Sequence, residues 1–170
     1  MCAKMFRASV FYEREPMDEQ NYDCLKLDRQ LCFHMYASSR AVIKSYKPLL
    51  DEIGLTYTQY MAMIVLWEHR TVTVKEMGQL LYLDSGTLTP LLKKLEEKGL
   101  VSRRRSAADE RNLIVALTEK GLALREAAAE IPERMRLRMT MSDEDSAEVR
   151  RLARKVLDVV EGSCAAKEKT

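Results

Sequence analysis

The stretch "LDSGTLTPLLKKLEEKGLVSRRRSAADERNLIVALT", residues 83–118, changes its hydrophobic period midway. Its first half carries leucines at helical spacing: Leu88, Leu91, Leu92 and Leu95. Pro90 should lie in the first turns of that helix, and Gly99 suits a left-handed helix end. Beyond Gly99, "LVSRRR" and "RNLIVALT" read as two strands joined by "SAADE". The sequence therefore predicts a helix followed directly by an arginine-rich hairpin.

Two helix-start signals precede this stretch. "TYTQ", residues 56–59, and "TVKE", residues 73–76, each place a threonine three positions before Gln or Glu. In such a capping box the two residues satisfy unpaired amide donors reciprocally. The boxes predict a helix over "YMAMIVLWEH" and a short one over "VKEMGQLLY". Residues of about 56–117 are thus expected to form helix, short helix, polar turn, helix and hairpin.

The segment before this unit is expected to be helical as well. Residues 1–20 show no clear periodicity and are expected to form a poorly ordered arm. From Leu25 an apolar stripe predicts a helix that Pro48 ends or kinks, because proline cannot donate to the preceding turn. A short helix should then stop at Gly54. Helices are therefore expected over about 25–54.

The segment after the hairpin predicts helices over about residues 118–162. Thr118 reads as the cap of the first, which Pro132 interrupts, and Ser142 as the cap of the last. The last helix carries an apolar stripe that consists of Val149, Leu152, Ala153, Val156, Leu157 and Val160. The predicted class is mainly α, with a two-stranded ribbon near the middle.

Length and composition fit one globular domain over residues 21–170. The chain has 170 residues, of which 46% are hydrophobic and 32% charged. Its longest apolar run, "MAMIVLW", is far shorter than the roughly 20 residues of a membrane span, and no signal-peptide pattern is read, so a cytoplasmic location is expected. Four cysteines without a CxxC spacing argue against a zinc ribbon, a thioredoxin motif and a disulfide framework. A net charge of +2 does not by itself indicate nucleic-acid binding.

The predicted order of elements is that of a winged helix-turn-helix, whose second helix enters the major groove while the hairpin reaches the minor groove or phosphates. The predicted DNA contacts on the helix are Ser85, Thr87, Thr89, Pro90, Lys93 and Lys94. Those in the hairpin are Arg103, Arg104, Arg105, Asp109 and Arg111, where Asp109 is expected to orient Arg111. Two alternatives stay open, because a solvated basic face and a protein-docking module share this pattern.

The flanking helices predict a homodimer. Their apolar stripes lie outside a winged unit that has its own core, and the simplest partner is a second copy of the same helices. A two-fold dimer would place its reading helices roughly 34 Å apart on a palindromic operator. The alternative is that the flanking helices fold back on their own chain.

The sequence resembles the MarR (multiple antibiotic resistance regulator) family, and within it the organic hydroperoxide sensing branch, OhrR. The resemblance is carried by "LCFHMYASSR", "YKPLLDEIGLTYTQY", "LWEHRTVTVKEMGQLLYLDSGTLTPLLKKLEEKGLV", "RRRSAADERNLIVALTEKG" and "IPERM". Asp109 and Arg111 match the Asp-x-Arg wing signature of the family. The resemblance implies a dimeric repressor that leaves its DNA when organic hydroperoxides oxidise a cysteine near the N-terminus. It also implies that the repressed gene encodes a thiol peroxidase.

By this resemblance the sensing cysteine is Cys32, and the tyrosines around its pocket are Tyr36, Tyr46 and Tyr57. Position alone favours an inert packing role for Cys32, since it lies within the predicted helix, where the helix dipole does not lower the pKa of a thiol. Phenols that donate hydrogen bonds to sulfur would stabilise the thiolate. Tyr36 is one turn away, but Tyr46 is about 21 Å along one helix. Tyr46 and Tyr57 are therefore expected to come from the other subunit.

Oxidised Cys32 is expected to form a sulfenic acid and then a disulfide with a thiol. Two-cysteine members of the branch use a cysteine in the C-terminal half of the partner, but here none occurs before Cys164, in the unmatched tail. Cys24 would lie roughly 12 Å from Cys32 on a single helix, which is too far for a bond. A small cellular thiol that caps Cys32 is the favoured hypothesis, and Cys164 stays open.

Three other functions were weighed. A repressor released by a small aromatic ligand would use the same fold, with Cys32 only structural. A thiol peroxidase would leave the winged segment unexplained, so an enzyme is not expected. A metal sensor is disfavoured because Cys32 and His34 point to different helix faces and His69 stands alone. No cofactor and no metal are predicted.

Overall fold

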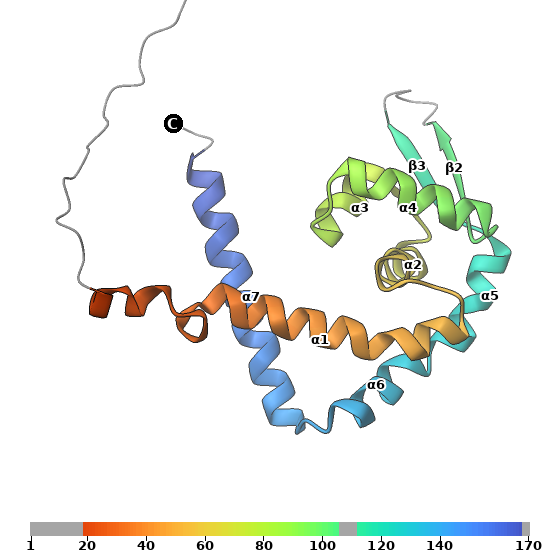
Figure 1. Ribbon diagram of the computed structural model, residues 1–170. Helices are drawn as coiled ribbons and strands as arrows, with labels where there is room; N and C mark the ends of the chain where they lie inside the picture. The colour runs from red at the N-terminus through yellow and green to blue at the C-terminus, as the bar shows by residue number, and fades with distance from the viewer. Residues whose placement is uncertain (1–18, 106–111, 168–170) are drawn as a thin grey trace, which may run out of the picture. The chain divides into compact units, whose positions relative to one another are not determined.

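The computed structural model describes residues 19–105 and 112–167. The chain divides into two compact units, residues 1–42 and 43–170. Figure 1 shows the helices and strands that each contains. Helices dominate the described residues, and a small antiparallel sheet accompanies them, which confirms the mainly α class. A single domain over residues 21–170 stays a prediction.

The first unit contains two 3-10 turns, η1 (Glu19–Leu25) and η2 (Leu27–Arg29), and the start of α1 (Leu31–Glu52). Lys26 and Gln30 are extended at the junctions, with ψ angles of 136° and 111°. The Gln30 side-chain amide donates hydrogen bonds to the carbonyls of Cys24 and Lys26. The prediction of a helix from Leu25 is therefore wrong, because side-chain to main-chain bonds compete with the helical ones here.

α1 passes through Pro48 without ending, contrary to the prediction of two helices. Leu49 and Leu50, which follow the proline directly, are buried in the core, so packing offsets the missing hydrogen bond. The predicted stop at Gly54 is confirmed, with φ of 66°. The amides of Gly54 and Leu55 donate to the carbonyls of Asp51 and Leu50, the pattern of a Schellman helix end.

α2 (Tyr57–His69) is the central helix of the second unit, and both of its sides are covered. Its buried residues are Gln59, Tyr60, Ala62, Met63, Val65, Leu66 and Trp67. Both predicted capping boxes are present: Thr56 with Gln59 opens α2, and Thr73 with Glu76 opens α3 (Val74–Leu81). The indole Nε1 of Trp67 donates to the Gly121 carbonyl at 2.8 Å, which ties α2 to α5 (Glu119–Ala128).

The turn between α3 and α4 (Ser85–Glu97) is tight. A Cβ at Gly78 would lie 2.8 Å from the Leu83 carbonyl oxygen, so this approach requires glycine. Tyr82 adopts a left-handed conformation, and Asp84 caps α4. Pro90 is the sixth residue of α4 and thus lies in its second turn, and the four leucines named above face the core.

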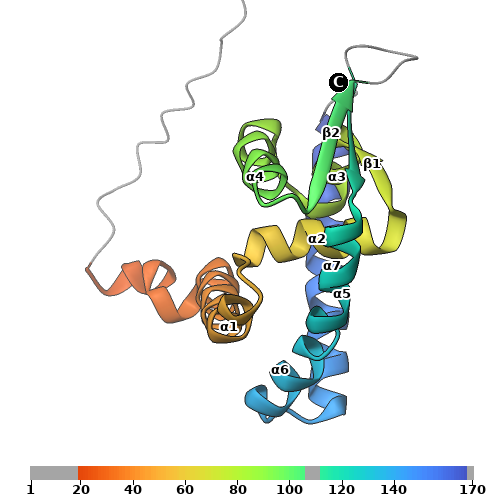
Figure 2. The same cartoon turned by 90° about the vertical axis from the view of Figure 1, so that its right-hand side faces the viewer.

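The sheet has three strands rather than the predicted two. β1 (Thr71–Thr73) pairs with β3 (Leu113–Leu117), which also pairs with β2 (Val101–Arg105), in the order β1-β3-β2 (Figure 2). The β2–β3 hairpin was predicted and is confirmed. β1 was missed because three residues are too few to show a period, although "TVT" is rich in β-branched residues. Residues 106–111, with Asp109 and Arg111, lie outside the described residues.

Three helices complete the chain: α5 (Glu119–Ala128), α6 (Ile131–Met139) and α7 (Asp143–Lys167). The predicted caps are confirmed, since Thr118 accepts from the Gly121 amide and Ser142 from the Asp145 amide. Pro132 is the second residue of α6, where a missing amide donor costs least. Within the described ranges, no helix is long and apolar enough to span a membrane.

Candidate DNA interface and redox site

The outer face of α4 carries every residue that the sequence predicted as a DNA contact on this helix. The side chains of Ser85, Thr87, Thr89, Pro90, Lys93 and Lys94 are all exposed. The opposite face is buried through Leu88, Leu91, Leu92 and Leu95. α4 therefore packs by one face and presents a polar and basic face outward, as a helix that enters a groove must.

The hydroxyl hydrogens at the start of α4 are already used within the helix. Thr87 donates from its hydroxyl to Asp84 at 2.9 Å, and Thr89 donates to the Ser85 carbonyl at 2.7 Å. The Thr87 amide also donates to Asp84, and these hydrogen bonds hold the pKa of Asp84 below its usual range. In this arrangement Thr87 and Thr89 can accept from a base amino group, but they would have to turn to donate to a phosphate.

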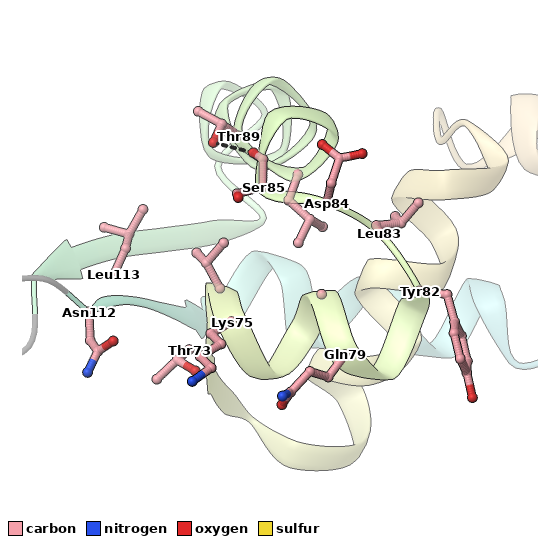
Figure 3. Close-up of a pocket in the computed structure, with 13 residues that line it drawn as sticks. Thr73, Lys75, Gln79, Tyr82, Leu83, Asp84, Ser85, Thr89, Asn112 and Leu113 are labelled. Carbon is pink, nitrogen blue, oxygen red and sulfur yellow. Dashed lines mark hydrogen bonds between the residues drawn. The ribbon is translucent and has the colours of Figure 1, made fainter. Parts of the chain in front are cut away.

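A groove of about 740 Å³ separates α3 from the start of α4 and reaches the base of β3 (Figure 3). Ser85 and Thr89 line it from α4, Lys75 and Gln79 from α3, and Asn112 from the edge of the hairpin. Sequence reasoning missed the last three. Their signal was available: Lys75 and Gln79 are four apart and share one face of the short helix.

The arginines of β2 differ in their surroundings. Arg103 donates from Nε and from a terminal nitrogen to Glu96 at 2.8 and 2.6 Å, and its amide also donates to Glu96. These hydrogen bonds hold the pKa of the Glu96 carboxyl below its usual range and fasten β2 to α4. Arg104 and Arg105 are exposed. Arg103 therefore fixes the position of the hairpin, whereas Arg104 and Arg105 face solvent.

Cys32 is exposed and is the second residue of α1. The expectation that it lies in the middle of a helix is wrong, because the chain before Leu31 forms 3-10 turns. The distance expected between Cys24 and Cys32 assumed that both lie on one helix. That assumption is wrong, because Lys26 and Gln30 are extended and interrupt the helix between them.

Tyr36 lies one turn after Cys32 on α1 and is 58% exposed. The guanidinium carbon of Arg40 lies 5.5 Å from the centre of its ring, a cation–π contact. In the single chain, therefore, neither Cys32 nor Tyr36 is covered.

The other two predicted pocket tyrosines lie together in the second unit. The rings of Tyr46 and Tyr57 meet edge to face with centres 5.3 Å apart, and Tyr60 lies 6.2 Å from Tyr46. Burial raises the pKa of the phenols of Tyr46, Tyr57 and Tyr60 above the ordinary value, with a smaller contribution from neighbouring tyrosines at Tyr46 and Tyr60. These phenols are therefore protonated at neutral pH and able to donate hydrogen bonds.

The flanking helices expose the stripes that the sequence predicted to be covered. On α1 the exposed apolar residues are Leu31, Met35, Tyr36 and Ile43. On α7 they are Val149, Leu152, Leu157, Val159 and Val160. Such stripes on a single chain are typical of surfaces that pair with another molecule.

Comparison with known proteins identifies the family. A family model described as transcriptional regulator SarA/Rot matches residues 44–127. The organic hydroperoxide resistance transcriptional regulator of Bacillus subtilis is 57% identical over 114 residues, which cover 67% of this chain and 78% of that protein.

Solved structures agree with that relative. AbfR of Staphylococcus epidermidis has been solved reduced and bound to DNA, with a TM-score of 0.67 and 34% identity over 80% of this chain and 95% of that one. Overoxidized AbfR bound to DNA gives a TM-score of 0.66 at 36% identity, over 79% of this chain and 96% of that one. The chain therefore belongs to the MarR family of transcriptional regulators, in the branch of the organic hydroperoxide resistance regulators.

Proposed function

We propose that the protein is a DNA-binding repressor that senses organic hydroperoxides through Cys32 and then releases its operator. The observation that carries this proposal is the exposed thiol in the first turn of α1, one turn before Tyr36, in a chain 57% identical to a hydroperoxide resistance regulator. A thiolate is the species that attacks a peroxide, and the exposed sulfur of Cys32 is open to that reaction.

The DNA-bound state is a homodimer on a palindromic operator. α4 enters the major groove with its exposed hydroxyl and lysine side chains, and Arg104 and Arg105 lead the hairpin to the adjacent minor groove or phosphates. Lys75, Gln79 and Asn112, which line the groove beside α4, add contacts to the sugar–phosphate backbone. Asp109 and Arg111 match the wing signature, and by that resemblance Arg111 adds a DNA contact that Asp109 orients. AbfR, a relative, has been solved on DNA.

Dimerisation completes the redox site. The exposed stripes of α1 and α7 pair with their counterparts, and Cys32 then meets Tyr46 and Tyr57 of the partner subunit. Because residues fourteen apart on a helix lie about 21 Å apart, these tyrosines and Cys32 of one chain do not share a site. The protonated phenols donate hydrogen bonds to the thiolate and so favour it.

Oxidation proceeds in two balanced steps. The thiolate of Cys32 attacks the terminal peroxide oxygen, an S–O bond forms, the O–O bond breaks, and the alkoxide leaves and takes a proton to become an alcohol. A small cellular thiol then attacks the sulfenic acid, an S–S bond forms, and water leaves. The bulky mixed disulfide no longer fits between the tyrosines, and the dimer rearranges. Overoxidized AbfR has been solved on DNA, which supports the disulfide rather than added oxygen as the releasing species.

The protein acts as a sensor and not as an enzyme, because each Cys32 consumes one hydroperoxide and then stays capped until a reductant restores it. Sustained peroxide turnover with a thiol reductant would contradict this. Release by phenolic compounds in the absence of peroxide would instead favour a repressor controlled by an aromatic ligand, with Cys32 only structural.

The test is fluorescence-anisotropy binding of the reduced protein to its own upstream promoter DNA. Cumene hydroperoxide is titrated with and without a small thiol, for wild type, Cys32→Ser and Cys24→Ser. We expect peroxide plus thiol to release wild type and Cys24→Ser but not Cys32→Ser. Release of Cys32→Ser would contradict the proposal. Retention of Cys24→Ser as well as Cys32→Ser, with release of wild type, would assign the second thiol to Cys24.

A further inference from the structure

The C-terminal end of α4 is tied to the beginning of α2 by one lysine. Lys98 follows α4 directly, and its Nζ donates hydrogen bonds to the Gly54 carbonyl and, at 3.1 Å, to the side-chain oxygen of Gln59. Figure 2 shows α4 over the N-terminal part of α2, and the two helices share a hollow lined by Thr58, Gln59 and Pro90. The link therefore runs between the reading helix and the loop that follows α1.

Gln59 is the acceptor that makes this link specific. It is 4% exposed, the only polar side chain that is buried among the described residues. The same side-chain oxygen accepts the Thr56 amide at 3.1 Å and so closes the capping box of α2. Tyr57 lies between these two residues in the first turn of α2, with its ring against Tyr46. The N-terminal cap of the helix that carries Tyr57 and the lysine that ends the reading helix therefore meet at one oxygen atom.

Lys98 is also held from a third direction. The Nζ of Lys120, in the first turn of α5, donates to the Lys98 carbonyl at 2.7 Å. This hydrogen bond ties the end of α4 to the start of α5, so a displacement of the α2 cap that reaches Lys98 acts on both helices. A chain of packed and hydrogen-bonded groups of this kind can couple two sites when both ends have two arrangements.

We propose that Lys98 and Gln59 are positioning residues that couple the tyrosine pocket to the reading helix. The proposal rests on the proposed function. When a capped Cys32 displaces Tyr57 of the partner subunit, the first turn of α2 shifts, and Lys98 draws the C-terminal end of α4 with it. Without the link, α4 follows only its apolar packing, and oxidation no longer changes the spacing of the reading helices.

The test compares the ratio of Kd for operator DNA after and before oxidation with cumene hydroperoxide plus thiol. Mass spectrometry first verifies that Cys32 is capped to the same extent in every protein. Lys98→Met keeps most of the aliphatic stem and removes the donor, and we expect its ratio to be at least fivefold below that of wild type. Gln59→Glu, which keeps both acceptor roles, should retain the wild-type ratio.

Lys93→Met is the matched control, because it removes one positive charge from the exposed face of α4, and Lys93 does not line the hollow beside Gln59. It should weaken DNA binding in both redox states and leave the ratio unchanged. A wild-type ratio in Lys98→Met would overturn the proposal and make Lys98 a structural or DNA contact. If Lys98→Met melts early, Lys98→Ala takes its place, because it also lacks a donor, and a wild-type ratio there has the same meaning. A wild-type protein that oxidation does not release would instead contradict the proposed function itself.

Discussion

α2 and α7 both carry apolar side chains, but only those of α2 are buried within a single chain. Ala62, Met63 and Leu66 on α2 are fully buried, whereas Leu152 and Leu157 on α7 are 46% and 42% exposed. The core around α2 also takes in Leu49 and Leu50 of α1 and Ile131 of α6, whereas α7 and the N-terminal part of α1 keep exposed apolar stripes. The difference supports the proposal that DNA binding depends on the closed core around α2, and that regulation depends on surfaces that a second copy completes.

The same substitution in the two helices should separate these roles. Leu66→Ala leaves a cavity in a closed core, and we expect it to lower the free energy of unfolding by about 2–5 kcal/mol. Leu152→Ala should change the unfolding of dilute monomer by only about 0.5 kcal/mol. Urea denaturation followed by circular dichroism at low protein concentration measures both. Equal losses would show that α7 belongs to the core of the single chain.

Charge on the α7 stripe should break the dimer but not the reading unit. Leu152→Glu combined with Leu157→Glu places carboxylates where two apolar stripes are expected to meet, and burying an unpaired charge is costly. We expect sedimentation velocity to report monomers with wild-type helix content. Operator affinity should fall at least about 100-fold, or about 2.7 kcal/mol, because one half-site is lost. A variant that remains dimeric would place the interface elsewhere.

Within the reading unit, single lysines should contribute modestly. Lys94→Gln on the exposed face of α4 removes one phosphate contact, so the slope of log Kd against log salt should fall by about 1. The loss should be similar for specific and random DNA, because phosphates carry no sequence information. Anisotropy titrations between 50 and 200 mM salt measure it. An unchanged slope would remove Lys94 from the interface.

The smallest expected effect is on pH dependence. Hydrogen bonds from Arg103 lower the pKa of Glu96 in the folded state, so the unfolded chain takes up this proton at higher pH than the native state does. The stabilisation is complete above the pKa of an unfolded glutamate and is lost as the pH falls through the folded value. Glu96→Gln should therefore lose less stability than wild type between pH 7 and about pH 3. Urea midpoints measured at both pH values check this, and parallel losses would contradict it.

Most of the fold was predictable because local signals decide it. The capping boxes at Thr56 and Thr73, the stop at Gly54 and the caps at Thr118 and Ser142 each depend on residues within one helical turn. The predictions were wrong where tertiary packing, or hydrogen bonds from side chains to the main chain, decide the local structure. Leu49 and Leu50 carry α1 through Pro48, and Gln30 draws the preceding chain into 3-10 turns.

The residues of the candidate site could be predicted from the sequence, but most of their contacts could not. The exposed face of α4 could be predicted from the spacing of its leucines. The ion pair between Arg103 and Glu96 could not, because it depends on how β2 packs against α4. The proximity of Tyr46 and Tyr57 joins α1 to α2 across a loop, and no period in the sequence reports it. The position of Cys32 in the first turn of α1 depended on a helix start that the apolar stripe placed too early.

The central claim is that the thiol and the phenols of one redox site come from different subunits, and a mixed dimer tests it most directly. One copy carries Cys32→Ser, the other carries Tyr46→Phe and Tyr57→Phe, and two different affinity tags isolate the heterodimer. If the site forms between subunits, the one remaining Cys32 faces intact tyrosines, and mass spectrometry should show its capping by hydroperoxide and thiol at the wild-type rate. The control is the homodimer in which both copies carry Tyr46→Phe and Tyr57→Phe. If Cys32 of the mixed dimer is capped as slowly as in this control, the site lies within one chain and the account is contradicted.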